Sequence, residues 1–266
     1  KYRDYLDPQF RDAFDMALPI QLEMNEKMEK LFLIDDINRL MDFAGFEKAL
    51  FYGGSWGSTL GFAYAIQNPE RVFGMVLRSS FLGNKEGIRY YIGGDIKMFQ
   101  PEIWQRFINL VPKEKRKDPI GYYYQKMRSK KASDRKTYAY EWSRYEMCIA
   151  PLTPPSEKQL DKVFQEMPYE SLGTLEAHYM QGRCFLPENY ILKNLKTIEN
   201  IPFDLIHGQY DLVCPPKHAY QLKAGLKKCT LKMTLDGHSI KSKAGLDHTK
   251  RMLNKQAKRW KREMRA

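Results

Sequence analysis

The chain has 266 residues, of which 43% are hydrophobic and 13% aromatic, so it can bury a sizeable core, and disorder as its main state is excluded. Its 44 basic and 32 acidic residues give a net charge of +12. Residues 223–266 alone hold 14 basic and three acidic residues, so nearly all of the excess is C-terminal. A nucleic-acid binder with an evenly basic surface is therefore not expected.

The sequence predicts a protein of a reducing, cytoplasmic setting. No run approaches the roughly 18 consecutive apolar residues that a membrane span needs, and the N-terminus lacks the pattern of a signal segment. The cysteines show neither Cys-x-x-Cys spacing nor the density of a disulfide scaffold: Cys148, Cys184, Cys214 and Cys229. No pair of histidines or cysteines has the spacing of metal ligands, so we expect no metal and no cofactor.

Strands and helices alternate in the predicted core. Apolar residues recur at helical spacing over 29–43, and Gly45 follows as a stop signal. A short apolar run at 48–52 ends in two glycines, and small and apolar residues fill 59–66, which predicts a strand, a tight turn and a buried helix. Three further short apolar runs are predicted strands: 72–77, 203–206 and 230–235. This order indicates an α/β fold with a mostly parallel sheet.

The stretch between residues 84 and 196 lacks the alternation of strands and helices predicted for the core. It contains long aromatic and charged segments of helical pattern and no short apolar run typical of a buried strand. We therefore expect a helical cap of residues 84–196 inserted into an α/β core formed by residues 1–83 and 197–266. The last segment, 242–264, predicts a helix with basic residues on a solvated face. Its apolar stripe is expected to pack on the sheet: Leu246, Leu253, Ala257, Trp260 and Met264.

Residues 53–57 read Gly-Gly-Ser-Trp-Gly, a G-x-S-x-G match centred on Ser55. The pentapeptide alone is a weak signal, and a glycine-rich turn with an incidental serine is the alternative. Its position between a predicted strand and a predicted helix is typical of the turn that projects a nucleophilic serine above the edge of a sheet. The glycines are explained by a strained turn and a close contact between strand and helix. Ser58 lacks such flanking glycines and is the weaker candidate.

A serine nucleophile needs a base and an orienting acid, which in this class of fold follow in the order Ser, Asp or Glu, His. Asp211 comes directly after the predicted strand at 203–206, and His238 comes after the one at 230–235. Both loops are expected at the same edge of the sheet as Ser55. Asp236 competes for the role of the acid, although local turn capping is its simpler role. The other histidines are weaker candidates for the base: His178, His207, His218 and His248.

Several longer sequence motifs together resemble those of a known protein family. They are Gly-Gly-Ser-Trp-Gly-Ser-Thr-Leu, His-Gly-Gln-Tyr-Asp-Leu-Val-Cys-Pro, Gly-His-Ser around His238, and Glu-Trp-Ser-Arg-Tyr-Glu and Leu-Glu-Ala-His-Tyr-Met in the cap. In order and spacing, from about residue 28 to about residue 239, the chain resembles the prolyl aminopeptidase (proline iminopeptidase) family of serine peptidases. The resemblance implies an α/β-hydrolase fold and release of N-terminal proline from peptides.

The resemblance also implies roles for particular residues. Ser55, Asp211 and His238 match the family's catalytic triad, and Glu146 and Glu176 match the two cap glutamates that hold the free N-terminal imino group of the substrate. A buried ammonium needs anionic acceptors nearby, which makes this role physically reasonable.

Four further residues match family positions around the site. Phe81 and Tyr91 match positions that line the pocket for the proline ring, and Arg78 matches a neighbouring arginine. Cys214 matches a cysteine that makes such enzymes sensitive to thiol reagents.

The chain departs from the family pattern before residue 55. The turn supplies one oxyanion donor, the backbone N–H of Trp56, whereas the family's second donor comes from a His-Gly-Gly-Pro-Gly loop that residues 1–54 lack. We therefore expect about four sheet strands to be missing and the strand at 48–52 to present an exposed edge. A truncated enzyme, an N-terminal segment that covers the edge in an altered protein, and a second chain that completes the sheet are the three explanations.

The function expected from these features is that of a serine exopeptidase acting on peptides with a free N-terminal proline, with neither nucleic acid nor membrane as a partner. A general esterase or amidase of the same fold is one alternative. A catalytically impaired binding protein that keeps the motif is another, because the second oxyanion element is absent. Binding of nucleic acid or an acidic membrane through the basic C-terminal helix is the least favoured. The oligomeric state is not predicted.

Overall fold

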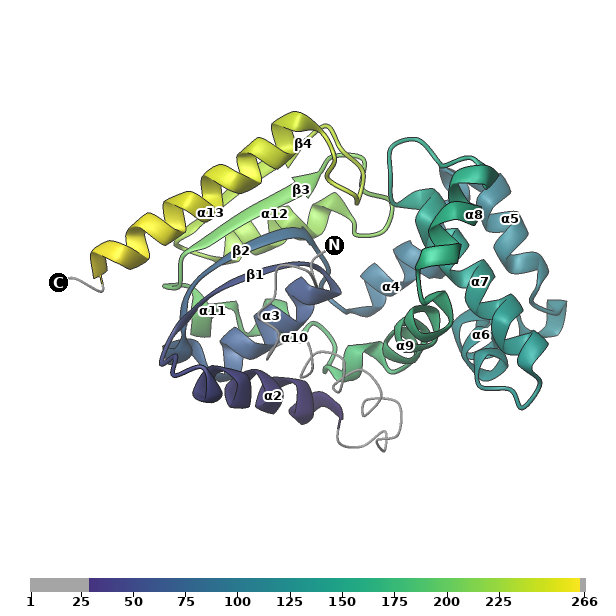
Figure 1. Cartoon of the computed structure of the whole chain (residues 1–266), viewed down its shortest axis with the longest axis horizontal. Coiled ribbons are helices and arrows are strands. Elements are labelled where there is room, and N and C mark those ends of the chain that lie inside the picture. Colours follow the sequence, from purple (N-terminus) through teal and green to yellow (C-terminus); the bar gives the residue numbers. More distant parts are fainter. Residues whose placement is uncertain (1–28, 264–266) are drawn as a thin grey trace.

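A four-stranded parallel sheet forms the centre of the fold in the computed structural model, which describes residues 29–263 (Figure 1). Its strands follow the order β1-β2-β3-β4, so β1 lies at one edge of the described sheet. All of the predicted strands are confirmed, with slightly different ends: β1 (Ala49–Ser55), β2 (Val72–Ser80), β3 (Phe203–Gly208) and β4 (Cys229–Thr234). The parallel register confirms the predicted α/β fold.

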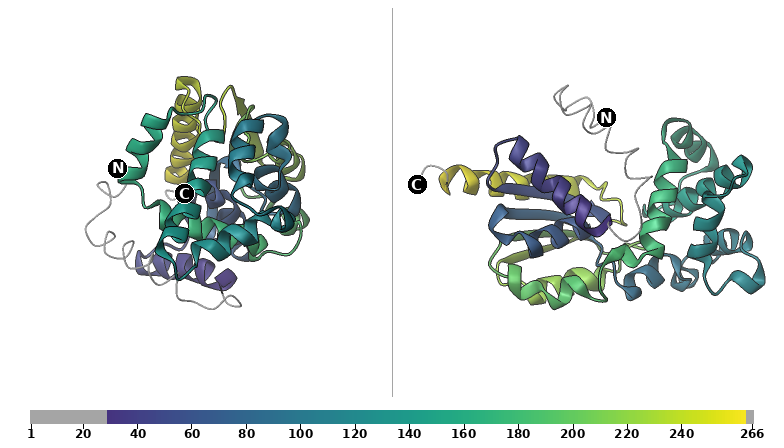
Figure 2. Two further views of the ribbon diagram at one scale, coloured as in Figure 1. Left: turned by 90° about the vertical axis from the view of Figure 1, so that its right-hand side faces the viewer. Right: turned by 90° about the horizontal axis from the view of Figure 1, so that it is seen from below.

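Alternate side chains of the strands face opposite layers of helices. Met75 and Leu77 of β2 belong to the larger cluster, whereas Val76 between them faces the other side. Five helices cover the first face: α2 (Glu29–Phe43), α3 (Trp56–Gln67), α10 (Tyr190–Lys193), α11 (Leu195–Ile198) and α12 (Pro216–Gly225). Of the helices within residues 29–263, α13 (Lys243–Glu263) alone lies on the second face (Figure 2). The helix predicted over 29–43 is confirmed, and Gly45 follows it with a φ of 70°.

The predicted orientation of the C-terminal helix is confirmed for Leu253 and Trp260, which pack on the sheet, and is wrong for Leu246 and Ala257. Leu246 is 48% exposed and Ala257 is exposed, while Met264 lies outside the described residues. The buried positions of α13 are Gly245, Thr249, Met252 and Gln256, with Leu253 and Trp260 partly buried.

The buried carboxylate of Asp204 in β3 explains this rotation of α13. Asp204 is 1% exposed and accepts hydrogen bonds from Gln256 Nε2 at 2.6 Å and Lys255 Nζ at 3.1 Å. A buried charge without partners costs several kcal/mol, so satisfying it outweighs burial of a few small apolar side chains. The basic side chains of Arg251, Lys258 and Lys261 remain exposed, as predicted.

Between β2 and β3 the described chain is helical and contains no strand. Six helices precede α10: α4 (Lys85–Ile92), α5 (Pro101–Asn109), α6 (Pro119–Met127), α7 (Ala132–Ile149), α8 (Glu157–Glu166) and α9 (Tyr169–Gln181). Helices α5 to α9 lie together beyond one end of the sheet (Figures 1 and 2). Helices α5, α6, α7 and α9 share an aromatic cluster in which the ring centroids of Phe107 and Tyr123 lie 4.2 Å apart, whereas α8 contributes to a separate, smaller cluster. The short helices α10 and α11 instead pack in the sheet cluster through Ile191, Leu195 and Ile198.

The expected cap boundaries at residues 84 and 196 stay a prediction, and the N-terminal segment proposed to cover the β1 edge lies outside the described residues. None of the helices within residues 29–263 is long and apolar enough to span a membrane.

Candidate active site

Ser55 is the last residue of β1 and stands directly before α3. Its φ of 53° and ψ of −127° are strained for a residue with a side chain, as the strand-to-helix turn predicts. At Gly53 a Cβ would lie 2.9 Å from the carbonyl oxygen of Gly57, so the close contact between strand and helix does require this glycine. At Gly57 itself no described heavy atom lies within 4 Å of a Cβ, so the steric interpretation was wrong there.

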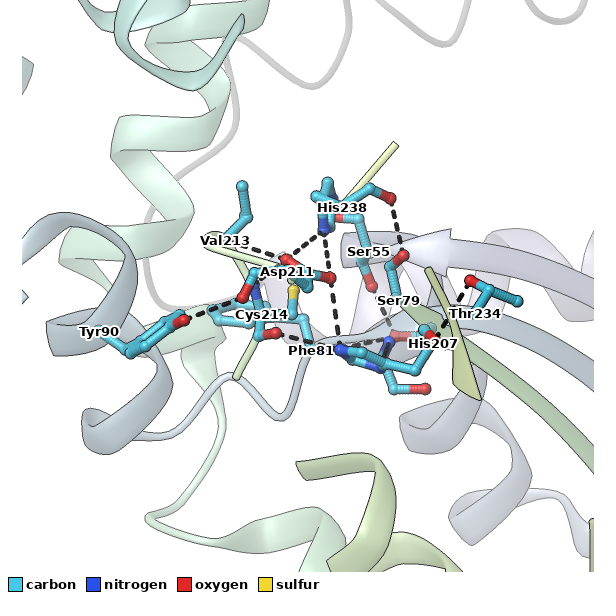
Figure 3. A network of polar contacts seen from close by, with 12 residues as sticks. Ser55, Ser79, Phe81, Tyr90, His207, Asp211, Val213, Cys214, Thr234 and His238 are labelled. Carbon is cyan, nitrogen blue, oxygen red and sulfur yellow. Dashed lines mark hydrogen bonds and ion pairs between the residues drawn. The ribbon is translucent and has the colours of Figure 1, made fainter. Parts of the chain in front are cut away.

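Asp211 and His238 meet at the ends of β3 and β4, as their loop positions predict (Figure 3). His238 Nδ1 lies 3.0 Å from Asp211 Oδ2 and 3.2 Å from Oδ1. The backbone N–H groups of Val213 and Cys214 donate to Oδ1 at 2.9 and 2.7 Å. Because Asp211 binds Nδ1, the Nε2 atom of the imidazole remains for proton exchange with another group.

The electrostatics of this pair suit a base and its orienting acid. Burial alone would lower the pKa of His238, but the charge and hydrogen bond of Asp211 hold that pKa above its usual value. Burial alone would raise the pKa of Asp211, yet His238 and the loop N–H groups hold it below its usual value. The carboxylate therefore stays ionised, and the imidazole gains basicity from it.

The thiol of Cys214 lies beside this pair. Its sulfur, a His238 ring nitrogen and an Asp211 oxygen all lie within 4.8 Å of one another. Burial, followed by the charges of Asp211 and Glu146, raises the pKa of the thiol well above its usual value. The thiol therefore stays protonated and is not a nucleophile. These three residues could in principle hold a metal ion, but the carboxylate already accepts several hydrogen bonds.

Glu146 of α7 and Glu176 of α9 form a carboxyl pair in the helical region that joins β2 to β3. Trp142 Nε1 donates to Glu176 Oε2 at 2.9 Å. Burial, and then the charge of the nearby Glu146, raise the pKa of Glu176 well above its usual value. The charge of Glu146 also acts on His238, so this carboxyl group lies within electrostatic range of the Asp211–His238 pair.

Tyr91 and Phe81 are buried in the aromatic cluster that also contains residues of α7 and α9. The buried hydroxyl of Tyr91 has no hydrogen-bond partner among the described residues, and its pKa is raised by burial and then by the charges of Glu146 and Glu176. The backbone of Phe81 is held by Ser58 Oγ, which accepts from its N–H at 3.0 Å. The role of the two rings in a pocket for the proline ring stays a prediction.

Arg78 and Trp56 flank the serine turn from two sides. Arg78 lies in β2, its side chain passes beside Gly54, and its charge acts against protonation of His238. Trp56 begins α3, which places its backbone N–H at the free start of the helix, and its ring packs 4.3 Å from that of Tyr179. The second oxyanion donor of the family is not found within residues 29–263, which contain no strand before β1.

Sequence reasoning missed three residues that hold the site in place. His207 was considered only as a weaker candidate for the base, yet its Nε2 lies 3.3 Å from Asp211 Oδ2. Tyr90 donates its hydroxyl to the carbonyl oxygen of Asp211 at 2.9 Å, and Trp142 binds Glu176. Trp142 could have been found from the sequence, since it stands four residues before Glu146 and thus on the same helix face.

The loop that carries His238 is packed against the end of β3 at Gly208. A Cβ there would lie 2.1 Å from the carbonyl oxygen of Gly237, so we expect Gly208→Ala to displace the loop and cost about 1–3 kcal/mol of stability. The midpoint of urea unfolding and kcat/KM should both be lower in this variant. The control is Gly225→Ala, whose Cβ would meet only the side chain of Leu195 and should leave kcat/KM nearly unchanged. Equal losses in both variants would contradict the expectation.

The parallel sheet, the strained serine turn and the Asp–His loops define a serine hydrolase of the α/β-hydrolase fold. The family model for that fold matches residues 19–240. A probable proline iminopeptidase of Leptolyngbya boryana is 30% identical over 249 residues, which cover 90% of this chain and 76% of the relative. A proline iminopeptidase of Arabidopsis thaliana is 30% identical over 248 residues, and the match covers 89% of this chain but 64% of that protein.

The likeness to solved structures shows the same fold. A haloalkane dehalogenase variant from Bradyrhizobium elkanii shares 14% identity and a TM-score of 0.56, with 92% of this chain and 78% of that one covered. The chain therefore belongs to the proline iminopeptidase family of α/β-hydrolases.

Proposed function

We propose that the chain is a serine exopeptidase that releases N-terminal proline from peptides. The observation that carries this proposal is the carboxyl pair Glu146–Glu176, because the charge of Glu146 acts on His238, the partner of Asp211. Helices of the region 84–196 supply this pair, so we propose that the region acts as a cap that recognises the substrate's amino end.

The triad performs acyl transfer in two halves. Ser55 Oγ attacks the carbonyl carbon of the first residue while His238 Nε2 takes the hydroxyl proton, and the N–H of Trp56 donates to the oxyanion. His238 then returns the proton to the leaving amine, which leaves a prolyl ester on Ser55. Water attacks this ester with His238 again as the base, and free proline departs. Asp211 keeps Nε2 available and stabilises the imidazolium.

The carboxyl pair selects a charged amino end. Burial, and then repulsion between the two neighbouring carboxylates, raise the pKa of Glu176 when the site is empty. A secondary ammonium bound between them offsets that repulsion and donates hydrogen bonds to the carboxylates. The blocked nitrogen of an acylated proline has neither a charge nor an N–H group and cannot replace it. Phe81 and Tyr91 line the apolar side where the proline ring would lie, with Arg78 nearby.

A comparison of free and blocked substrates tests this assignment. We expect proline 4-nitroanilide to be cleaved and N-acetylproline 4-nitroanilide to be left intact. Glu176→Gln should lower kcat/KM for the free substrate by about 10- to 100-fold, the effect of a lost charge-assisted hydrogen bond. Labelling of Ser55 by a small fluorophosphonate should be unchanged, because that probe carries no amine.

The control variant is Glu166→Gln, an exposed glutamate at the end of α8 that should behave as wild type. Cleavage of simple esters unaffected by Glu176→Gln, together with no cleavage of any proline amide, would instead identify a general esterase. A chain that does not react with the fluorophosphonate would be a binding protein.

A further inference from the structure

His207, the penultimate residue of β3, is fully buried between the end of β2 and the loop that carries Asp211. The backbone N–H of Ser80 donates to its Nδ1 at 3.2 Å. A backbone amide can only donate, so Nδ1 must be the acceptor and the proton of the neutral ring must sit on Nε2. The tautomer of His207 is thus fixed by the end of the neighbouring strand.

The Nε2–H of His207 points into the loop of Asp211. It donates to the carbonyl oxygen of Cys214 at 3.1 Å, and Nε2 lies 3.3 Å from Asp211 Oδ2. Oδ1 is held by two backbone N–H groups, whereas Oδ2 lies between two imidazoles, His207 on one side and His238 on the other (Figure 3). Burial lowers the pKa of His207, so this ring supplies a dipole and no positive charge.

We propose that His207 is a positioning residue for Asp211, whose Oδ2 it holds toward His238 Nδ1 and whose negative charge it partly neutralises, thereby setting the basicity of His238. The proposal rests on the proposed function in that it takes Ser55, His238 and Asp211 as the triad. With the Nε2–H removed, Oδ2 would interact with His238 alone. The imidazole would then hold its proton more tightly and act as a base only at higher pH.

The other groups that face the two imidazoles do not supply a donor to Oδ2 in the described part of the chain. They are Arg78 of β2, Tyr90 of α4, Glu146 of α7, Cys214 beside Asp211, and His218 of α12. Tyr90 binds the backbone carbonyl of Asp211 rather than its carboxylate. A change at His207 should therefore reach His238 through Asp211.

Two substitutions separate positioning from a purely structural role. An asparagine amide reaches about as far as Nδ1 of histidine, so His207→Asn can still accept from Ser80 but places no donor beside Asp211. A glutamine amide reaches about as far as Nε2, so His207→Gln restores an N–H beside Oδ2. Because each variant keeps the contacts of one of the two ring nitrogens, a loss of packing or stability alone affects both.

The test is the rate of fluorophosphonate modification of Ser55 in the full chain, measured against pH with the probe in excess. Only folded molecules react, so each observed rate constant is divided by the folded fraction measured in the same buffer. His207→Asn should react about tenfold more slowly at neutral pH, with the midpoint of its acidic limb moved to higher pH. His207→Gln should follow the wild-type profile within about threefold.

Profiles that coincide for the two variants, whether both shifted or both unchanged, would overturn the proposal. If His207→Asn yields no folded protein, His207→Gln decides alone, since a displaced midpoint in that variant contradicts the role and an unchanged one supports it. The probe needs no peptide. A wild-type chain that is labelled but cleaves no proline amide therefore refutes the proposed function and leaves this test intact, and a chain that is not labelled refutes both.

Discussion

Ser55→Ala should lower kcat/KM for proline 4-nitroanilide by about a millionfold while leaving the protein folded. Removing the nucleophile of a serine peptidase has an effect of this order because the base, the acid and the oxyanion donor have nothing to act through. The fold should tolerate the change, since the side chain of Ser55 makes no capping hydrogen bond to α3. Alanine also adopts the same backbone angles at similar cost, so the melting temperature should move little.

Ser58→Ala is the matched control, three residues further along the chain in α3. Ser58 Oγ donates to the carbonyl oxygen of Ser55 at 2.6 Å and accepts from the N–H of Phe81, all within the buried core. Its removal leaves a buried N–H unpaired, which costs about 1–3 kcal/mol of stability but removes no reacting group. Hydrolysis and thermal unfolding of both variants should therefore separate chemistry from stability. Full activity in Ser55→Ala would refute the assigned nucleophile.

The order of strands and the approach of Asp211 to His238 could be predicted because they depend on local patterns. Short apolar runs form the strands, and the carboxyl ends of parallel strands must meet at one edge. The same reasoning found Ser55, whose turn follows from a strand that runs directly into a helix. These features need no knowledge of which distant side chains touch.

Features that depend on distant partners were not predictable in the same way. The orientation of α13 follows from Asp204, about fifty positions earlier in the chain, whose charge draws Gln256 inward in place of Ala257. The role of His207 depends on the backbone of Ser80 in a neighbouring strand. The free space for a side chain at Gly57 likewise depends on which residues surround the turn in the folded chain. A periodic pattern describes one element and contains no information on such contacts.

Asp211→Asn should lower kcat/KM by about ten thousandfold, although the substitution changes the shape of the side chain very little. The amide oxygen must take the place of Oδ1, because the N–H groups of Val213 and Cys214 both donate to that position. The amide NH₂ is then forced to the place of Oδ2, opposite His238 Nδ1. A donor there makes Nδ1 an acceptor and places the imidazole proton on Nε2. The protonated Nε2 can then no longer take the proton of Ser55. The new NH₂ would also face the Nε2–H of His207, a contact between two donors.

The rival acid provides the control for this prediction. Asp236 Oδ1 accepts from the N–H groups of Lys241 and Ser242, and Oδ2 accepts from Ser242 Oγ, so this carboxylate anchors the start of α13 rather than the imidazole. Asp236→Asn should cost about 1 kcal/mol of stability and change kcat/KM by less than about tenfold. Measured kcat/KM and thermal unfolding of the two variants decide between them. A larger loss of activity in Asp236→Asn than in Asp211→Asn would transfer the orienting role to Asp236, since only the group that sets the tautomer of His238 can have the larger kinetic effect.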